Sequence, residues 1–354
     1  MTEYIHRIIN KEHLSDYLEA RFGSSSVYKI HYHNRGHSNE TLFIRWGDRN
    51  LVLRRPPPGE VATSAHDVLR EYRVISALQP TNVSVPPTVA SCDDHSIIGS
   101  DFYMMEAVEG NVIRNDLPDH FTKNTHKRQI GLEVIDRLAQ IHDVDYEAIG
   151  LSDFGSPEGF TKRQIDRWTK QFEWATKITD SERNISQINF VSKWLMQNAP
   201  ETHSHALVHG DYKLDNVMFG PQVPPQIVSI FDWELSTLGD PLTDLGWLLS
   251  FWWDKGDPDP PNSINSLYPD FTRQNMYATR HELIDRYEQK TGMIFTNQRF
   301  YRVLAVYKLA ALGEMFFRRH LEGNSDDPLY PKMENGVPDL ITRAIRIIDG
   351  EEPL

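Results

Sequence analysis

The amino-acid sequence predicts an α+β fold of two lobes, with a small N-terminal lobe built on an antiparallel sheet and a larger, mostly helical C-terminal lobe. Three observations support this prediction. Two apolar-rich runs, TLFIRW and NLVLRR, flank the turn signal GDRN, which is typical of a β-hairpin. From about residue 125 onward the apolar spacing becomes mainly helical. A connector at residues 106–110 separates the two patterns, so we place the lobes at residues 1–106 and 107–354.

Length and composition are those of a soluble globular protein. The chain has 354 residues, of which 39% are hydrophobic and 25% charged. Cys92 is the single cysteine, so we expect no disulfide framework and a reducing, cytoplasmic location. The net charge of −13 argues against a nucleic-acid partner. The first residues lack the apolar core of a secretory signal, and LGWLLSFWW is too short to span a bilayer, which indicates a buried helix and no membrane partner.

The N-terminal elements follow in chain order. HLSDYLEARF has helical spacing, and the triple proline after Arg55 ends the second strand of the hairpin. TSAHDVLREYRVISALQP predicts a helix with Thr63 or Ser64 as its N-cap and Pro80 as its terminator. IIGSDFYMMEAVEGNVI predicts a strand that leaves the first lobe, with a change of direction at Gly110.

One carboxylate lies on the apolar face of the helix that precedes Pro80. Glu71 shares that face with Val68, Ile75 and Leu78, because the spacings are three, four and seven residues. Burying a carboxylate alone is costly, so Glu71 needs a cationic partner. We expect that partner on the arginine-bearing strand NLVLRR.

A second predicted hairpin lies within the larger lobe and carries the chemistry. LVHGDYKLDN is followed by two short strands, NVMF and QIVSIFDW, joined by GPQVPP. Asp232 ends the second strand and faces back along the hairpin toward Asn216. Phosphoryl transfer needs an aspartate to orient a hydroxyl and accept its proton, together with oxygen ligands for Mg²⁺. We assign Asp211 as the catalytic base, and Asn216 and Asp232 as catalytic residues that bind the metal.

HGDYKLDN with the downstream FDWE resembles the aminoglycoside phosphotransferase superfamily, which shares the protein-kinase fold. The runs LVLRRPPPG, LREYRVISAL, FYMMEAVEGNVI and DWELSTLGDPLTDLGWLL extend the likeness over most of the chain. They are similar to a narrower branch, the kinase-like domains fused to some acyl-CoA dehydrogenases. The resemblance implies a bilobal protein-kinase-like fold and an ATP-dependent phosphotransferase, with ATP and Mg²⁺ as cofactors and a small-molecule hydroxyl as acceptor.

The small lobe is expected to bind the nucleotide. Strand alternation puts Val52 and Arg54 on one face, so Val52 would pack on adenine while Arg54 reaches the phosphates with Glu71 as its partner. Arginine stands where the superfamily has lysine; the alternative is that Arg54 is a plain surface cation.

Two further segments are assigned to the nucleotide by resemblance. The loop NRGHSNE would cover the phosphates through Gly36, Ser38 and Asn39, although a plain turn is the alternative. In the connector MMEAV, backbone groups of Glu106 and Val108 would meet the adenine edge.

Several polar residues near the motif have structural interpretations. We expect Asp244 to cap the following helix or brace the catalytic loop through backbone N–H groups, and His209 to brace the same loop. Lys213 would neutralise the transferring phosphoryl group or pair with a carboxylate, and Glu234 is a structural partner or a substrate contact. A metallohydrolase built on His203, His205, His209 and Asp211 fails on spacing, and a zinc site at His31, His33 and His37 is disfavoured.

The hypotheses differ in the molecule that accepts the phosphoryl group. An aminoglycoside would suit acidic residues near the chain end, such as those of EGNSDDPLY or DGEEPL. The closer resemblance implies a hydroxyacyl thioester or hydroxy acid, for which Lys213, Arg318 and Arg319 are candidate cations. A hypothesis of another class is a catalytically silent kinase-like module that only binds nucleotide.

Overall fold

The computed structural model describes most of the chain. The described residues are 5, 8–33, 39–58, 67–114, 116–177, 185, 187–202, 204–268, 272, 274, 276–323 and 327–353. Two of the predicted phosphate-loop residues, Gly36 and Ser38, lie outside this set, as do His37 and His203.

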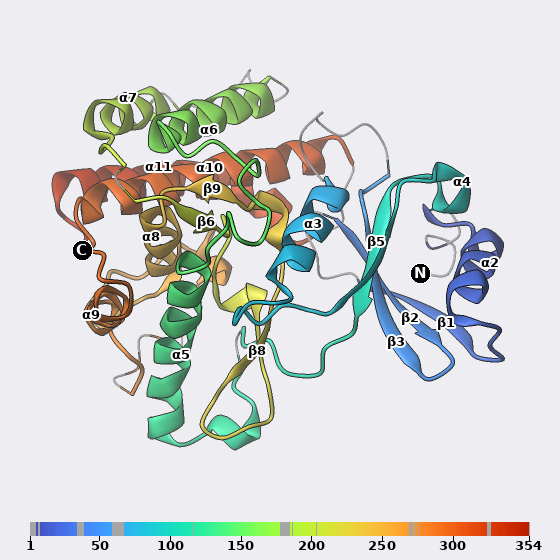
Figure 1. The fold of residues 1–354 in the computed structure, drawn as a ribbon. Helices are drawn as coiled ribbons and strands as arrows, with labels where there is room; N and C mark the ends of the chain where they lie inside the picture. Colours follow the sequence, from blue (N-terminus) through green and yellow to red (C-terminus); the bar gives the residue numbers. More distant parts are fainter. Residues whose placement is uncertain are drawn as a thin grey trace.

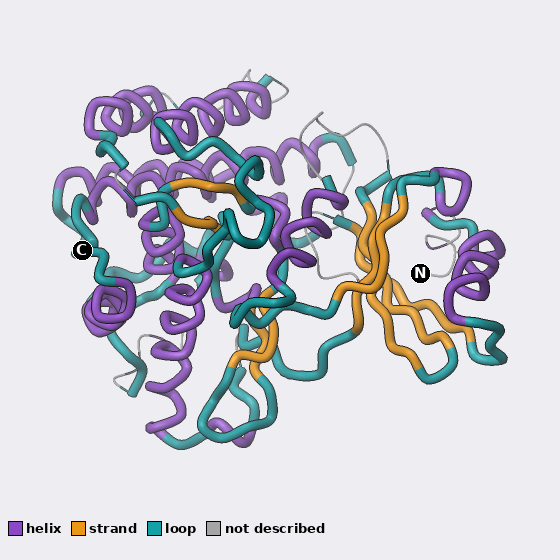
Figure 2. Tube along the Cα trace, in the orientation of Figure 1, coloured by secondary structure: helices purple, strands orange, loops and turns teal. Residues whose placement is uncertain are grey.

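The N-terminal lobe is a five-stranded antiparallel sheet with the strand order β1-β2-β3-β5-β4 (Figures 1 and 2). The turn between β2 and β3 is the two-residue Gly47–Asp48 that the sequence indicated, since Trp46 pairs with Arg49. The bounds are β1 (Tyr28–His33), β2 (Glu40–Trp46), β3 (Arg49–Arg55), β4 (Thr88–Cys92) and β5 (Phe102–Glu106).

The two faces of this sheet bury different side chains. Leu51 and Leu53 of β3 belong to a core shared with α2 (Lys11–Phe22) and α4 (His95–Ile98), at the far right in Figure 1. Val52 of the same strand lies in the main core, together with apolar residues of α3 (Val68–Leu78). Strand alternation therefore directs Val52 and Arg54 toward the C-terminal lobe, as predicted.

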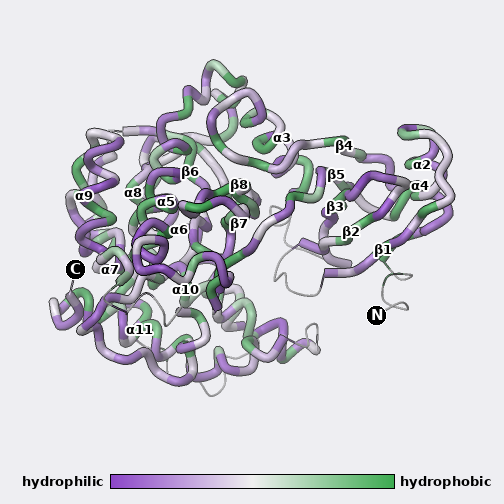
Figure 3. The backbone as a smooth tube through the Cα atoms, turned by 90° about the horizontal axis from the view of Figure 1, so that it is seen from below, coloured by the Kyte–Doolittle hydropathy of each residue, from purple (hydrophilic) through white to green (hydrophobic). Residues whose placement is uncertain are grey.

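The C-terminal lobe is largely helical. Helix α10 is its centre and packs against α6, α8 and α11. Figure 3, seen from below, shows the sheet and α2 on one side of the molecule and these helices on the other. The bounds are α5 (Asn124–His142), α6 (Phe160–Thr176), α7 (Ile188–Asn198), α8 (Leu242–Phe251), α9 (Arg280–Thr291), α10 (Gln298–Leu321) and α11 (Met333–Asp349).

Two short antiparallel strand pairs lie among the helices and hold the motif loops. β6 (Ala206–Val208) pairs with β9 (Thr237–Gly239), and β7 (Val217–Phe219) pairs with β8 (Ile227–Ile230). The β7–β8 hairpin is the one predicted from NVMF and QIVSIFDW. Because β6 precedes and β9 follows it along the chain, both motif loops are brought to one place.

Some sequence predictions about element ends were wrong. The N-cap of α3 is Asp67, whose side chain accepts the Arg70 N–H, so the helix does not begin at Thr63 or Ser64. The strand predicted from residue 97 begins at Phe102, because Ile97 and Ile98 belong to α4 and Gly99 ends that helix in a left-handed conformation. The sequence analysis did not identify β4, β6 or β9.

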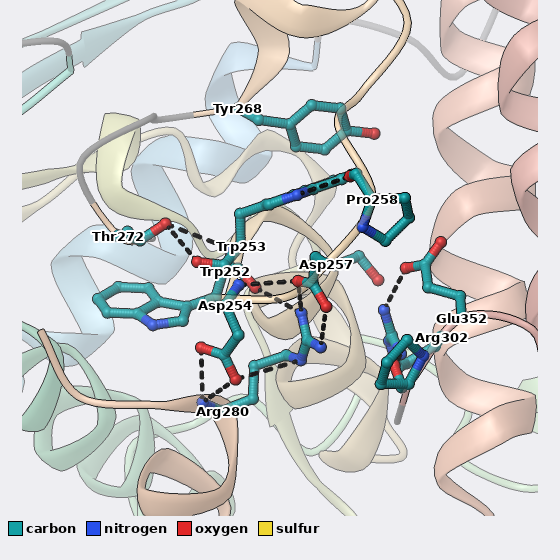
Figure 4. A network of polar contacts seen from close by, with 12 residues as sticks. Trp252, Trp253, Asp254, Asp257, Pro258, Tyr268, Thr272, Arg280, Arg302 and Glu352 are labelled. Atoms are coloured by element: carbon teal, nitrogen blue, oxygen red, sulfur yellow. Dashed lines mark hydrogen bonds and ion pairs between the residues drawn. The ribbon is translucent and has the colours of Figure 1, made fainter. Parts of the chain in front are cut away.

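A network of buried charge fixes the end of the C-terminal lobe (Figure 4). The guanidinium of Arg280 forms a two-pronged ion pair with the carboxylate of Asp257. Glu352, near the chain end, accepts hydrogen bonds from Arg302 (2.6 Å) and from Arg343 (2.8 Å). Glu352 is 2% exposed, so these pairs anchor the final residues against α10 and α11. Among the described helices, none has the length and apolar content needed to cross a membrane.

Candidate active site

Asp244, in the first turn of α8, fixes the loop between β6 and β7. Its carboxylate accepts the backbone N–H of His209 (2.6 Å) and of Gly210 (2.8 Å). His142 approaches the same carboxylate at 3.3 Å. Asp244 therefore braces the loop through backbone N–H groups, as the sequence analysis expected, while the N-cap position of α8 belongs to Pro241.

His209 braces the loop from inside. Its Nδ1 accepts the Asp211 N–H at 3.1 Å, so the proton lies on Nε2, which donates to the Phe231 carbonyl at 2.9 Å. Burial lowers the pKa of His209, which keeps the ring neutral and suits this arrangement. The imidazole thus connects the catalytic loop to the strand that leads to Asp232.

Glycine is required at position 210. Its φ of +86° lies in the left-handed region, and a Cβ there would come within 2.5 Å of the Leu235 carbonyl oxygen. The backbone can therefore turn sharply between His209 and Asp211, which places the loop against the segment that follows Asp232.

Asp211 is surrounded by donors. Its Oδ1 accepts the indole N–H of Trp247 at 2.9 Å. Its Oδ2 accepts from the ammonium of Lys213 at 2.6 Å and from the amide of Asn216 at 2.8 Å. Burial by itself raises the pKa of the Asp211 carboxyl, but Lys213 and Lys308 outweigh it and hold that pKa below its ordinary value. An ionised, fixed carboxylate is what a proton acceptor needs.

Asn216 and Asp232 meet at one end of the β7–β8 hairpin. The Phe231 N–H donates to the Asn216 carbonyl at 2.9 Å, so Asp232 follows directly after the partner of Asn216. Asp232 has a φ of +66°, a conformation that is rare outside glycine, and its carboxylate accepts from Arg54. The structure brings together all three residues predicted for catalysis.

The donor set fits a magnesium ion. Both hydrogen bonds of the Asn216 side chain use its nitrogen, which leaves the amide oxygen as a ligand beside the Asp232 carboxylate. Hard oxygen ligands from one amide and one carboxylate suit Mg²⁺, which keeps waters and phosphate oxygens in its other positions. Within the described part of the chain, no group of three or more His, Cys, Asp or Glu side chains could hold a metal; His37 and His203, one from each rival histidine site, lie outside that part.

Arg54 links the small lobe to Asp232. Its guanidinium donates to Glu71 at 2.9 Å and to Asp232 at 3.1 Å. Burial raises the pKa of Glu71 to about 7, against the opposing effect of Arg54. Arg54 is 7% exposed, so the alternative of a plain surface cation is wrong. Its remaining Nε–H has no partner in the described structure, which leaves a buried donor for a phosphate oxygen.

The other residues assigned to the nucleotide lie around this pair. Asn39 is buried and donates to the Glu234 carboxylate at 3.1 Å, so it joins the start of β2 to the loop after Asp232. Val52 is 6% exposed on the face that it shares with Arg54. The Glu106 N–H donates to the Pro87 carbonyl at 2.8 Å, which restricts an adenine contact there to its carbonyl oxygen. Val108 follows in the connector.

Sequence reasoning missed two residues next to Asp211. Trp247 was assigned to an apolar helix, yet its indole holds the carboxylate. Lys308 donates to the Gly210 carbonyl, and its ammonium lies 4.0 Å from the centre of a Trp247 ring. A signal existed, because Lys308 is the lone charged residue in the apolar run VLAVYKLAAL.

Some of the residues proposed to bind the acceptor already have partners within the protein. Arg318 bonds to Glu322 at 2.8 Å and to the Trp174 carbonyl at 2.7 Å, so it does not line an open site. Glu352 of DGEEPL accepts hydrogen bonds from two arginines. Lys213 lines a hollow with Arg114, whereas residues 324–326 of EGNSDDPLY lie outside the described residues.

Comparison with known proteins defines the class of this chain. Residues 29–277 match the phosphotransferase enzyme family, which comprises the aminoglycoside phosphotransferases and their relatives. The chain therefore belongs to this family, and its two-lobed architecture is the kinase-like fold.

Particular relatives narrow the comparison. The chain is 35% identical to acyl-CoA dehydrogenase family member 11 of Mus musculus over 312 residues, which are 86% of this chain but only 38% of that protein. A solved structure of a proposed aminoglycoside phosphotransferase from Ralstonia eutropha JMP134 has a TM-score of 0.78 and 28% identity, and the match covers 97% of this chain and 99% of that one. Aminoglycoside phosphotransferase APH(4)-Ia, solved with AMP-PNP and hygromycin B, has a TM-score of 0.59 and 16% identity over 94% of this chain and 98% of that one.

Proposed function

We propose that this protein transfers the γ-phosphoryl group of ATP to an alcohol hydroxyl, and that the acceptor is a hydroxy acid or its hydroxyacyl thioester. The observation that carries the reaction class is the single cluster in which Asp211, Asn216 and Asp232 meet beside Arg54. Nucleotide as donor is supported by the fold, since the structural neighbour APH(4)-Ia was solved with AMP-PNP.

Each residue has a role in this reaction. Asp211 orients the acceptor hydroxyl and receives its proton as the oxygen forms a bond to the γ-phosphorus and the bond to the β–γ bridging oxygen breaks. ADP leaves with that electron pair. Arg54 binds phosphate oxygens, and Asn216 and Asp232 would hold Mg²⁺, which supplies positive charge at the transferring group when it is bound.

The acceptor class is supported by a hollow beside the catalytic loop. It is lined by Lys213 and Arg114, by the carboxylate-bearing Asp215, and by apolar side chains that include Phe251 and Trp252. Lys213 also contacts the Asp211 carboxylate, so a ligand in this hollow lies next to the proposed base. Arg114, with Lys213 between the hollow and Asp211, supplies positive charge next to apolar side chains, which suits a carboxylate or thioester carrying an acyl chain.

The acidic residues near the chain end do not favour an aminoglycoside. A polycationic acceptor would need available carboxylates, but Glu352 and Glu322 are already paired with arginines. An anionic hydroxyacyl compound and a polycationic aminoglycoside differ in charge, so one assay that includes both can tell which acceptor class the protein uses.

The test is a measurement of ADP release with ATP and Mg²⁺ on matched acceptors. The panel is 3-hydroxybutyrate, 3-hydroxybutyryl-CoA and longer hydroxyacyl-CoA compounds, with butyryl-CoA as the control that lacks a hydroxyl, and kanamycin as the cationic rival. We expect release with hydroxyacyl compounds only, together with a phosphorylated product by mass spectrometry. Release with kanamycin alone would overturn the acceptor class. ATP binding without transfer to any acceptor would indicate a silent nucleotide-binding module.

A further inference from the structure

Lys308 is a partly buried lysine that the proposed reaction leaves without a role. It lies on α10 in an apolar stretch, 98 residues from Gly210, whose carbonyl it contacts. Its ammonium is held between two indoles, 4.0 Å from a ring of Trp247 and 5.3 Å from a ring of Trp168. Among the described residues no carboxylate lies within ion-pair distance of it. Holding a lysine partly out of water has a cost, which the contacts with the carbonyl and the two indoles offset.

The contacts of Lys308 converge on Asp211 from two sides. One contact is the Gly210 carbonyl, in the residue that precedes Asp211 and has the required left-handed turn. The other is the face of Trp247, whose Nε1–H holds the Asp211 Oδ1 at 2.9 Å. A cation over an indole face draws on the π electrons, which makes the ring N–H a stronger donor. The positive charge of Lys308 therefore influences the Asp211 carboxylate through Trp247 and Gly210, without a direct contact between the two side chains.

We propose that Lys308 is a positioning residue, which acts through Trp247 and the Gly210 carbonyl to hold the Asp211 carboxylate in its reactive orientation. The inference rests on the proposed function, because Asp211 is the base of that reaction. Arg54, Asn216 and Asp232 bind the phosphates and metal from the other lobe and the hairpin, so this device is separate from nucleotide binding.

The charge state of Lys308 gives the device a pH dependence. Burial lowers the pKa of Lys308 to about 8, opposed by Asp211 and Asp244 and assisted by Lys213 and Arg167. These four are the charged groups that face it from the catalytic loop, α8 and α6. The ammonium is present below that pH and is lost as the pH rises through about 8. The orientation of Asp211 should weaken over the same range.

The direct test follows the indole N–H of Trp247 by nuclear magnetic resonance in the full chain. The signal is assigned by its loss in Trp247→Phe. We expect a downfield position at pH 7 that moves upfield as the pH is raised from 7 to 9. Lys308→Met should show the upfield position at every pH, while Lys308→Arg should keep the downfield position and lose the titration. The exposed Lys170→Met on α6 is the matched control.

Kinetics supply the second readout, with the acceptor that gives ADP release. Lys308→Met should lower kcat at pH 7 by roughly tenfold or more, with KM for ATP changed less than about twofold, which is the pattern of a lost transition-state contact. Lys308→Arg should restore kcat and flatten its fall above pH 8. A Trp247 signal that is unchanged in Lys308→Met and flat from pH 7 to 9 would overturn the inference. Because that signal needs no turnover, failure of the proposed function would be seen separately.

Discussion

Two networks of buried charge lie in this molecule, one at the C-terminal end and one around the motif, and they differ in the partners that their charged groups have. At the C-terminal end, Arg280 meets Asp257 through both prongs of its guanidinium (Figure 4). Glu352 is shared by Arg302 and Arg343. Around the motif, Asp211 is held by three donors, Lys213 and Asn216 from its own loop and Trp247 from α8. Arg54 donates to two carboxylates, those of Glu71 and Asp232. In both networks an arginine Nε–H has no hydrogen-bond partner in the described structure, at Arg280 and Arg302 in the first and at Arg54 in the second. The second network also has the Asn216 amide oxygen, because both hydrogen bonds of that side chain use its nitrogen.

The difference indicates what each network does. The first network pairs the Asp257 and Glu352 carboxylates with arginines and so orders the chain end. In the second network the charged groups are already removed from water in the folded protein. They can therefore exchange a protein partner for a phosphate or a metal ion at a smaller desolvation cost. Mutations should therefore separate activity from stability between the two regions.

The largest effect is expected at Asp211. Asp211→Asn keeps the shape and the contact with Trp247 but removes the proton acceptor, so kcat should fall by about 10²–10⁴-fold. ATP affinity, measured by calorimetry, should stay close to that of the parent. Because Lys213 loses its carboxylate partner, kcat is compared per folded molecule. Equal turnover in variant and parent would show that Asp211 is not the base.

The next effect, on stability alone, is expected at Glu352. Glu352→Gln leaves Arg302 and Arg343 without their carboxylate in a buried site, which should reduce the free energy of unfolding by roughly 3–5 kcal/mol. Denaturant unfolding measures this loss, and kcat per folded molecule should not change. Glu351→Gln, at an exposed neighbour, is the control. A fall in kcat without loss of stability would connect the chain end to the active site.

The smallest effect is expected at Arg54. Arg54→Lys keeps a cation but cannot hold Glu71 and Asp232 at the same time, since an ammonium lacks the planar fork. We expect KM for ATP to rise about tenfold, equivalent to roughly 1.4 kcal/mol, with a smaller change in kcat. Arg49→Lys on the same strand, which pairs with Glu106 at the surface, serves as the control. If Arg54→Lys bound ATP as the parent does, the two-carboxylate arrangement would have no bearing on the nucleotide.

Much of the site was readable because its signals are local. His209, Asp211 and Asn216 lie within one loop, and the two strands after it place Asp232 opposite that loop. The pairing of Glu71 with Arg54 followed from a carboxylate on an apolar helix face and a strand that alternates, and the structure contains it at 2.9 Å. The cap of α3 was misplaced, because several residues before Val68 have side chains able to cap and only the backbone chooses among them.

The sequence by itself determined the two-lobed organisation, the β2–β3 and β7–β8 hairpins and the residues of the motif, since these depend on spacings of a few residues that backbone geometry converts into proximity. The tertiary structure alone decided that Lys308 and Trp247 lie beside Asp211, that Glu352 is buried between arginines, and that Arg318 pairs with the Trp174 carbonyl. Those outcomes depend on the rotation and packing of helices that are distant in the chain. A contact made across 98 residues is fixed by the whole core and is written in no short stretch of sequence.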